Sequence, residues 1–120
     1  MTGEARSAPE QLAVSRDRRR LTLRYADGTS HELTAEMLRV LSPSAEVQGH
    51  SPEQRVTVAG KREVAISDVR PIGHYAVRIV FDDGHDSGLY TWPYLDRLGT
   101  ERDTLWNAHL ADLEAKGLSR

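Results

Sequence analysis

The chain of 120 residues contains no cysteine. Without a thiol, it can form no disulfide, bind no metal ion through thiolates and carry out no thiol redox chemistry. Long apolar runs are missing too, since the longest are short stretches such as Ile79–Phe81. A membrane-spanning helix needs about 20 apolar residues, and the start of the chain does not resemble a secretion signal. These absences predict a cytoplasmic protein that does not enter a membrane.

An excess of basic residues is also absent. The formal net charge is −2 and the sequence pI about 6.2, whereas nucleic-acid-binding domains are usually basic. The one basic run, Arg16 and Arg18–Arg20, is interrupted by Asp17. We interpret this run as a solvated approach to the first strand, with contact to a phosphate or an acidic partner as the alternative. Nucleic acid is not expected as a partner.

Motifs for catalysis are missing as well. There is no Gly-x-Ser-x-Gly elbow, no Walker loop and no Gly-x-Gly-x-x-Gly turn. None of the five histidines pairs with another at the i, i+4 spacing of a helical metal motif, and none begins the His-x-Asp/Glu pattern of iron oxygenases. The sequence therefore predicts a protein that is not an enzyme.

Two Asp-Gly turns between alternating segments are the clearest positive signal. Residues 21–33 and 75–90 each read as strand, turn and strand, with the turns at Asp27–Gly28 and Asp83–Gly84. Apolar residues on both faces of 76–81 predict a central strand. We predict an α+β fold with a small, mostly antiparallel sheet built from these two hairpins, short helices and an amphipathic C-terminal helix.

Helix signals follow each hairpin. Thr34 is a plausible N-cap for a helix over 35–40, and Thr91 precedes a helical turn that we expect to end at Gly99. The last helix is predicted to open with a capping box at Thr100–Asp103. Its apolar side should pack on a sheet face, and it consists of Leu105, Trp106, Leu110 and Leu113.

The remaining segments predict the domain organisation. Residues 1–18 are polar and are expected to form a flexible tail, which leaves a single domain over 19–117. Residues 41–60 read as an irregular loop, rich in serine, proline and glycine, with a brief strand over 55–58. A further strand is expected over 64–72.

Two groups of side chains are candidates for binding. Tyr90 and Trp92 belong either to the core or to a patch that binds a partner, and the loop from Arg39 to His50 is a second candidate surface. His85 looks exposed beside Asp82, Asp83 and Asp86. That group either shapes the turn or forms a surface cation site.

Several ordered motifs resemble one known family, the gamma-butyrobetaine-hydroxylase-like N-terminal domain. The similarity covers about residues 20–115. The motifs are Tyr25-Ala-Asp-Gly28, Leu38-Arg39, Ser42-Pro-Ser-Ala-Glu-Val-Gln-Gly-His50, Ile72-Gly73-His-Tyr-Ala76 and Asp83-Gly-His-Asp-Ser-Gly-Leu-Tyr90. In eukaryotic members the domain precedes an iron- and 2-oxoglutarate-dependent dioxygenase domain, which has no counterpart in this sequence.

The resemblance also implies a zinc site in relatives, held by three cysteines and the histidine of Asp-Gly-His. Here Ser42, Ser44 and Val47 stand at the three thiolate positions, and only His85 matches. A neutral hydroxyl is a poor zinc ligand and an isopropyl group is none. We therefore expect that the zinc site is lost and that the chain carries no cofactor.

The implied function is that of a non-catalytic accessory module that binds a protein partner, including the option of a homodimer. Similar domains are appended to Mrp-like P-loop ATPases linked to iron–sulfur cluster assembly, which suggests that setting by analogy. Candidate contact residues are Arg39, His50, Tyr90 and Trp92. The alternative is a weak metal-binding protein that uses His85, His50 and nearby carboxylates.

Overall fold

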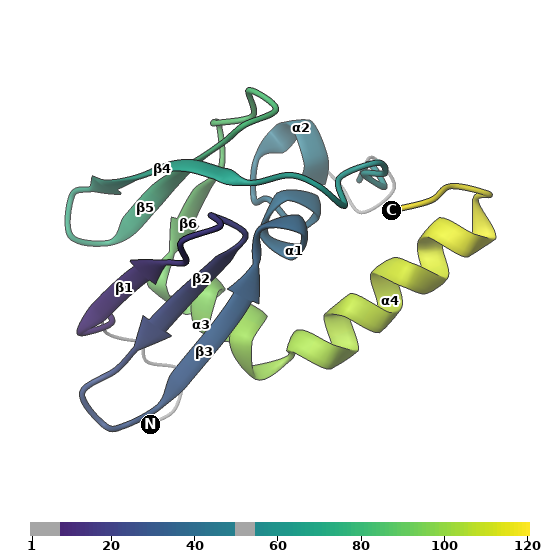
Figure 1. The fold of residues 1–120 in the computed structure, drawn as a ribbon. Coiled ribbons are helices and arrows are strands. Elements are labelled where there is room, and N and C mark those ends of the chain that lie inside the picture. Colours follow the sequence, from purple (N-terminus) through teal and green to yellow (C-terminus); the bar gives the residue numbers. More distant parts are fainter. Residues whose placement is uncertain (1–7, 50–54) are drawn as a thin grey trace.

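The computed structural model describes residues 8–49 and 55–120. Over these residues the fold is α+β, as the sequence predicts, with the strands in two antiparallel three-stranded sheets (Figure 1). The elements in chain order are β1 (Gln11–Val14), β2 (Arg20–Arg24), β3 (Ser30–Thr34), α1 (Ala35–Val40), α2 (Ala45–Gln48), β4 (Ile66–Ile72), β5 (Ala76–Phe81), β6 (Leu89–Thr91), α3 (Trp92–Thr100) and α4 (Arg102–Ala115).

The first Asp-Gly hairpin joins β2 to β3 within the sheet β1-β2-β3. Leu21 pairs with Leu33, and both are fully buried. At the turn, the Asp27 carboxylate accepts a hydrogen bond from the Thr29 N–H, and Gly28 adopts a φ of 91°. Glycine takes this backbone conformation at little cost because it has no Cβ. The hairpin is therefore confirmed.

Strand β1 corrects the prediction of a tail over 1–18, which is wrong for residues 11–14. Leu12 pairs with Leu23, Val14 pairs with Leu21, and both side chains pack against the core. Four residues without a turn signal give too short a pattern to be recognised in the sequence. Residues 1–7 of the predicted tail lie outside the described residues.

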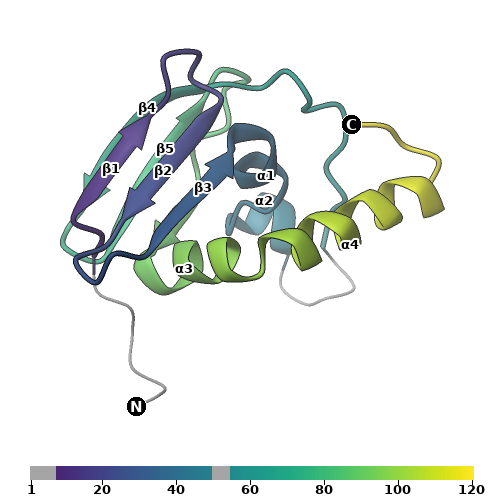
Figure 2. The ribbon, with the colours of Figure 1, turned by 60° about the horizontal axis from the view of Figure 1, so that its bottom comes forward.

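The second sheet has the order β4-β5-β6, so β5 is the central strand, as predicted. The Asp83–Gly84 turn follows β5, but β6 begins only at Leu89. The intervening residues carry His85 inward, with its C=O accepting a hydrogen bond from the Phe81 N–H at 3.0 Å. The two predicted hairpins therefore lie in separate sheets (Figure 2). The brief strand expected over 55–58 is wrong, because this segment forms no strand.

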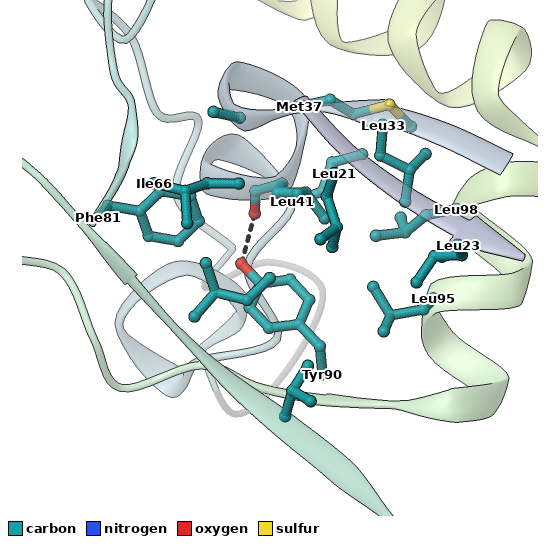
Figure 3. Packing of buried hydrophobic residues seen from close by; sticks show 14 of the residues in the cluster. Leu21, Leu23, Leu33, Met37, Leu41, Ile66, Phe81, Tyr90, Leu95 and Leu98 are labelled. Carbon is teal, nitrogen blue, oxygen red and sulfur yellow. Dashed lines mark hydrogen bonds between the residues drawn. The ribbon is translucent and has the colours of Figure 1, made fainter. Parts of the chain in front are cut away.

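The core lies between the two sheets and helices α1 and α3. Figure 3 shows leucines of β2 and α3 facing Tyr90 and Phe81 of the second sheet. Tyr90 is completely buried, and its hydroxyl donates to the Leu38 carbonyl oxygen at 2.5 Å. This bond satisfies a polar group that would be costly to bury alone.

The N-caps of α1 and α3 are as predicted, whereas two other predicted helix ends are wrong. The Thr34 and Thr91 hydroxyls accept hydrogen bonds from the backbone N–H groups of Met37 and Tyr94. The predicted end of α3 at Gly99 is wrong, because the helix continues to Thr100. Gly99 lies inside the helix, close to the ring of His31. The capping box predicted for α4 is wrong, since its N-cap is Glu101 and no side chain caps it.

Helix α4 extends away from the sheets (Figures 1 and 2). Asp112 accepts a hydrogen bond from Thr57, and Gly60 N–H donates to the Ser119 carbonyl oxygen. The expected packing on a sheet face is wrong for most of α4, because the helix lies against residues 55–58 and α1, with Leu105 and Trp106 packed on the core. Among the described residues, no helix has the length and apolar character needed to span a membrane.

Candidate functional site

The turn between α1 and α2 carries three of the residues that the resemblance singled out. Ser42 is fully buried, Ser44 is the N-cap of α2 and Val47 is buried within that helix. The Ser44 hydroxyl accepts a hydrogen bond from the Glu46 N–H at 3.1 Å, which is the usual role of serine at an N-cap. This turn lies against the loop between β5 and β6, which carries His85.

His85 is inside this contact and not on the surface, which corrects its exposed appearance in the sequence. The residue is only 7% exposed, and its Nε2 lies 2.8 Å from the Ser42 Oγ in a hydrogen bond. Ser42 Oγ also accepts a hydrogen bond from the Ser44 N–H at 3.2 Å. One hydroxyl thus joins two loops that are 43 residues apart in the chain.

A second set of hydrogen bonds closes the contact on its outer side. The Ser44 and Ser87 hydroxyls are 2.8 Å apart, and Ser87 donates to the Glu46 carboxylate at 2.6 Å. The other oxygen of Glu46 lies 3.9 Å from His85 Nδ1. Ser87 and Glu46 were not predicted as members of the site, because nothing in their local sequence indicates that their two loops meet.

An ion cluster supports the same loop. Asp83 contacts Arg39 at 2.8 Å and Lys61 at 2.6 Å, and it accepts a hydrogen bond from the His85 N–H. Although burial acts to raise it, these bonds hold the pKa of Asp83 well below its usual range. The Arg39 side chain is only 12% exposed, so this candidate contact residue is largely enclosed.

Burial lowers the pKa of His85, and the nearby Arg39 guanidinium lowers it further. The residue is therefore neutral at pH 7, as a metal ligand must be. The other donors do not fit zinc, however. Two neutral hydroxyls already engaged in hydrogen bonds and the alkyl side chain of Val47 cannot replace three thiolates. The described part of the chain contains no group of three histidine, aspartate or glutamate side chains placed to hold a metal ion.

Gly88 allows the two loops to approach closely. A Cβ at this position would lie 2.5 Å from the Ser42 Oγ and 3.1 Å from the Tyr90 ring. Glycine at this position therefore allows a close contact with the α1–α2 turn.

The remaining candidate residues are dispersed. Tyr90 is buried, which supports its interpretation as a core residue and removes its side chain from any surface patch. Trp92 is half-buried, with its indole N–H donating to the His74 carbonyl oxygen, beside the 55% exposed Tyr75. His50 lies outside the described residues. The structure therefore gathers Ser42, Ser44, Val47 and His85, and places Trp92 elsewhere.

Comparison with known proteins places the fold and this site in one family. The family model "Gamma-butyrobetaine hydroxylase-like, N-terminal" matches residues 12–96. The chain belongs to this family, as its motifs indicated. No curated protein matches the chain.

Solved structures share the fold over nearly the whole chain. Two proteins known from NMR solution structures are 49% and 41% identical, with TM-scores of 0.81 and 0.84. Their alignments cover 95% and 100% of this chain and 90% and 89% of those chains. A protein of unknown function in the DUF971 family, from Acidithiobacillus ferrooxidans, is 37% identical with a TM-score of 0.65. That alignment covers 81% of this chain and 98% of that one.

Proposed function

We propose that the protein is a non-catalytic accessory module that binds a protein partner and holds no metal ion. The observation that carries this proposal is the hydrogen-bonded junction of Ser42, Ser44, Ser87 and His85. It fills the position at which the resemblance implies zinc, and His85 Nε2 and the three hydroxyls are engaged in hydrogen bonds with one another. The junction has the character of a structural contact, because its hydroxyls and His85 Nε2 bind one another.

The surface beside the second sheet supports the binding of a protein. Tyr75 is 55% exposed next to the half-buried Trp92, whose backbone N–H donates to the Tyr75 carbonyl oxygen at 3.3 Å. Aromatic side chains are enriched where proteins meet, because they bury a large area with few rotatable bonds. Of the contact residues predicted from the sequence, Trp92 remains on this surface, and Tyr75 joins it.

A photo-crosslinking experiment tests the binding. A photoreactive phenylalanine analogue at position 75 should form one discrete adduct in cells, and the same group at Leu118, which is also exposed, should not. Adduct masses distinguish a second copy of the chain from another protein. Sizing that shows only a monomer, together with no adduct at position 75, would remove the proposal. An adduct with a protein of iron–sulfur cluster assembly would support the setting suggested by the family analogy.

Weak metal binding at His85 is the second candidate function. The approach of Glu46 to within 3.9 Å of His85 Nδ1 favours it, since both are possible ligands. Two protein ligands bind a metal ion much more weakly than the four of a structural zinc site. A rise in melting temperature with added zinc that disappears in His85→Gln would support this function, and no rise in the untagged protein would remove it.

A further inference from the structure

A cleft on the opposite side of α1 has the parts of an arginine-binding site. It has a volume of about 320 Å³ and lies between the end of β3, helix α1 and helix α4. Its walls include Glu36 and Met37 of α1 and Arg102 and Trp106 of α4, and Arg120 reaches into it from the end of the described chain. None of these residues takes part in the Ser42–His85 junction.

The base of the cleft is a buried carboxylate. The Glu36 side chain is 8% exposed, and both of its oxygens accept hydrogen bonds from the Arg120 guanidinium, at 2.8 and 3.1 Å. A buried carboxylate without a partner is strongly unfavourable, so this position requires a cation. The planar guanidinium matches two carboxylate oxygens, which the ammonium group of lysine cannot do.

The second wall is an aromatic face. The central carbon of the Arg120 guanidinium lies 5.4 Å from the centre of the Trp106 ring, within the range of a cation–π contact. The ring itself is packed against His109, with centroids 5.3 Å apart. The indole therefore has a packing contact with His109 that does not involve Arg120.

The occupant, in contrast, is partly open to solvent. Arg120 is 40% exposed and lies beyond Gly117, where a φ of 66° ends α4 and turns the chain back (Figures 1 and 2). Without Arg120, the cleft would hold the carboxylates of Glu32, Glu36 and Asp103 against one guanidinium, that of Arg102. Arg102 is itself engaged, donating to the Glu32 carbonyl oxygen at 3.2 Å. The walls therefore carry an excess of negative charge.

We infer that this cleft binds an arginine side chain of the protein partner, and that Arg120 occupies the site in its absence. The existence of that partner rests on the proposed function, whereas the existence of the site does not. An arginine supplied by the partner would take over the contacts of Arg120 with Glu36 and Trp106. The open volume beside Arg120 gives the incoming chain space to enter before the exchange.

A titration with a small probe tests the site directly. N-acetyl-arginine amide is added to the ¹⁵N-labelled full chain, and the Trp106 indole N–H and the Glu36 backbone N–H are followed by NMR. Because Arg120 competes in the wild type, Arg120→Ala should bind the probe about threefold more tightly. N-acetyl-citrulline amide has the same shape without the charge and should cause no shift.

Two further variants separate loss of the site from loss of the fold. Glu36→Gln and Trp106→Leu, each in the Arg120→Ala background, should both lose the probe while the remaining spectrum stays that of a folded protein. Absence of probe shifts in Arg120→Ala, or equal shifts with citrulline amide, would overturn the inference. Probe binding without any adduct at position 75 would support the arginine site but would contradict the existence of a protein partner. If the wild-type protein is a dimer and Arg120→Ala dissociates it, the incoming arginine comes from a second copy of the chain and not from a different protein.

Discussion

At the residue scale, Ser42 and His85 show how hydroxyls can take the place of thiolates between two loops. A hydroxyl binds zinc poorly, but it accepts and donates hydrogen bonds, and here Ser42 does so with His85 and the Ser44 N–H. Both partners are buried, so each bond matters more for stability than it would at the surface. Hydrogen bonds thus join the two loops at the position where the resemblance implies a zinc ion.

The junction predicts the effect of Ser42→Ala. Removal of the hydroxyl leaves His85 Nε2 buried without its partner, so the free energy of unfolding should fall by about 1–3 kcal/mol. Ser30 is exposed in β3, and Ser30→Ala serves as the control, with an expected change below about 0.5 kcal/mol. Chemical denaturation measures both variants. Equal stabilities of the two would show that the Ser42–His85 bond contributes nothing.

His109 predicts a dependence of stability on pH. It is 8% exposed, and its Nε2 has no hydrogen-bond partner among the described residues. Burial lowers the pKa of His109 below the ordinary 6.5. Nearby charges act on this pKa in both directions: the carboxylates of Glu36 and Asp112 raise it, and the guanidinium groups of Arg55 and Arg120 lower it. The unfolded chain therefore takes up the proton first as the pH falls.

The sign of the effect follows from that lowered pKa. Stability linked to His109 is complete above pH 6.5 and is lost as the pH falls from there towards the folded-state pKa. Denaturation curves between about pH 8 and pH 5 should show this loss, and His109→Gln should make it smaller. His85, whose pKa is also lowered, accounts for part of the remaining slope. Parallel pH profiles for the wild type and His109→Gln would contradict this account of His109.

At the scale of elements, helix α3 lies so close to β3 that packing opposes intrinsic helix propensity. A Cβ at Gly99 would overlap the ring of His31, which itself hydrogen-bonds to Asp96. Propensity alone predicts that Gly99→Ala gains about 1 kcal/mol, while overpacking costs about 1–3 kcal/mol. We expect a net loss of stability, measured by chemical denaturation. Asn107→Ala, at an exposed position of α4, is the control, and its free energy of unfolding should rise by a few tenths of a kcal/mol. A rise in Gly99→Ala as well would contradict the close packing of α3 on β3.

Local signals explain which elements the sequence predicts. Thr34, Thr91 and Asp27–Gly28 act through hydrogen bonds within a few residues, so their patterns are visible in the sequence and the structure confirms them. Strand β1 pairs with the neighbouring strand β2, but its four residues are too few for a recognisable pattern. The burial of His85 depends on a contact with Ser42, which is 43 residues away in the chain. The packing of α4 fails as a prediction for the same reason, since an apolar helix face does not say what it packs against.

At the scale of the whole molecule, three regions are distinct. The Ser42–His85 junction holds the α1–α2 turn to the second sheet, the aromatic pair Tyr75 and Trp92 lies at the opposite end of β5, and the Glu36–Trp106 cleft lies beside α4. The family membership predicts the fold and identifies the junction. The cleft was not predicted, because its residues come from three distant segments and include no motif.

The most direct test of the central claim is the zinc content of the untagged protein, purified from cells grown with added zinc and measured by elemental analysis. The variant Ser42→Cys/Ser44→Cys/Val47→Cys restores the thiolates that the resemblance implies, and it should retain about one zinc ion per chain. The wild-type protein is predicted to retain none after dialysis. Stoichiometric zinc in the wild type, lost on His85→Gln, would contradict the claim that hydrogen bonds have replaced a metal site here.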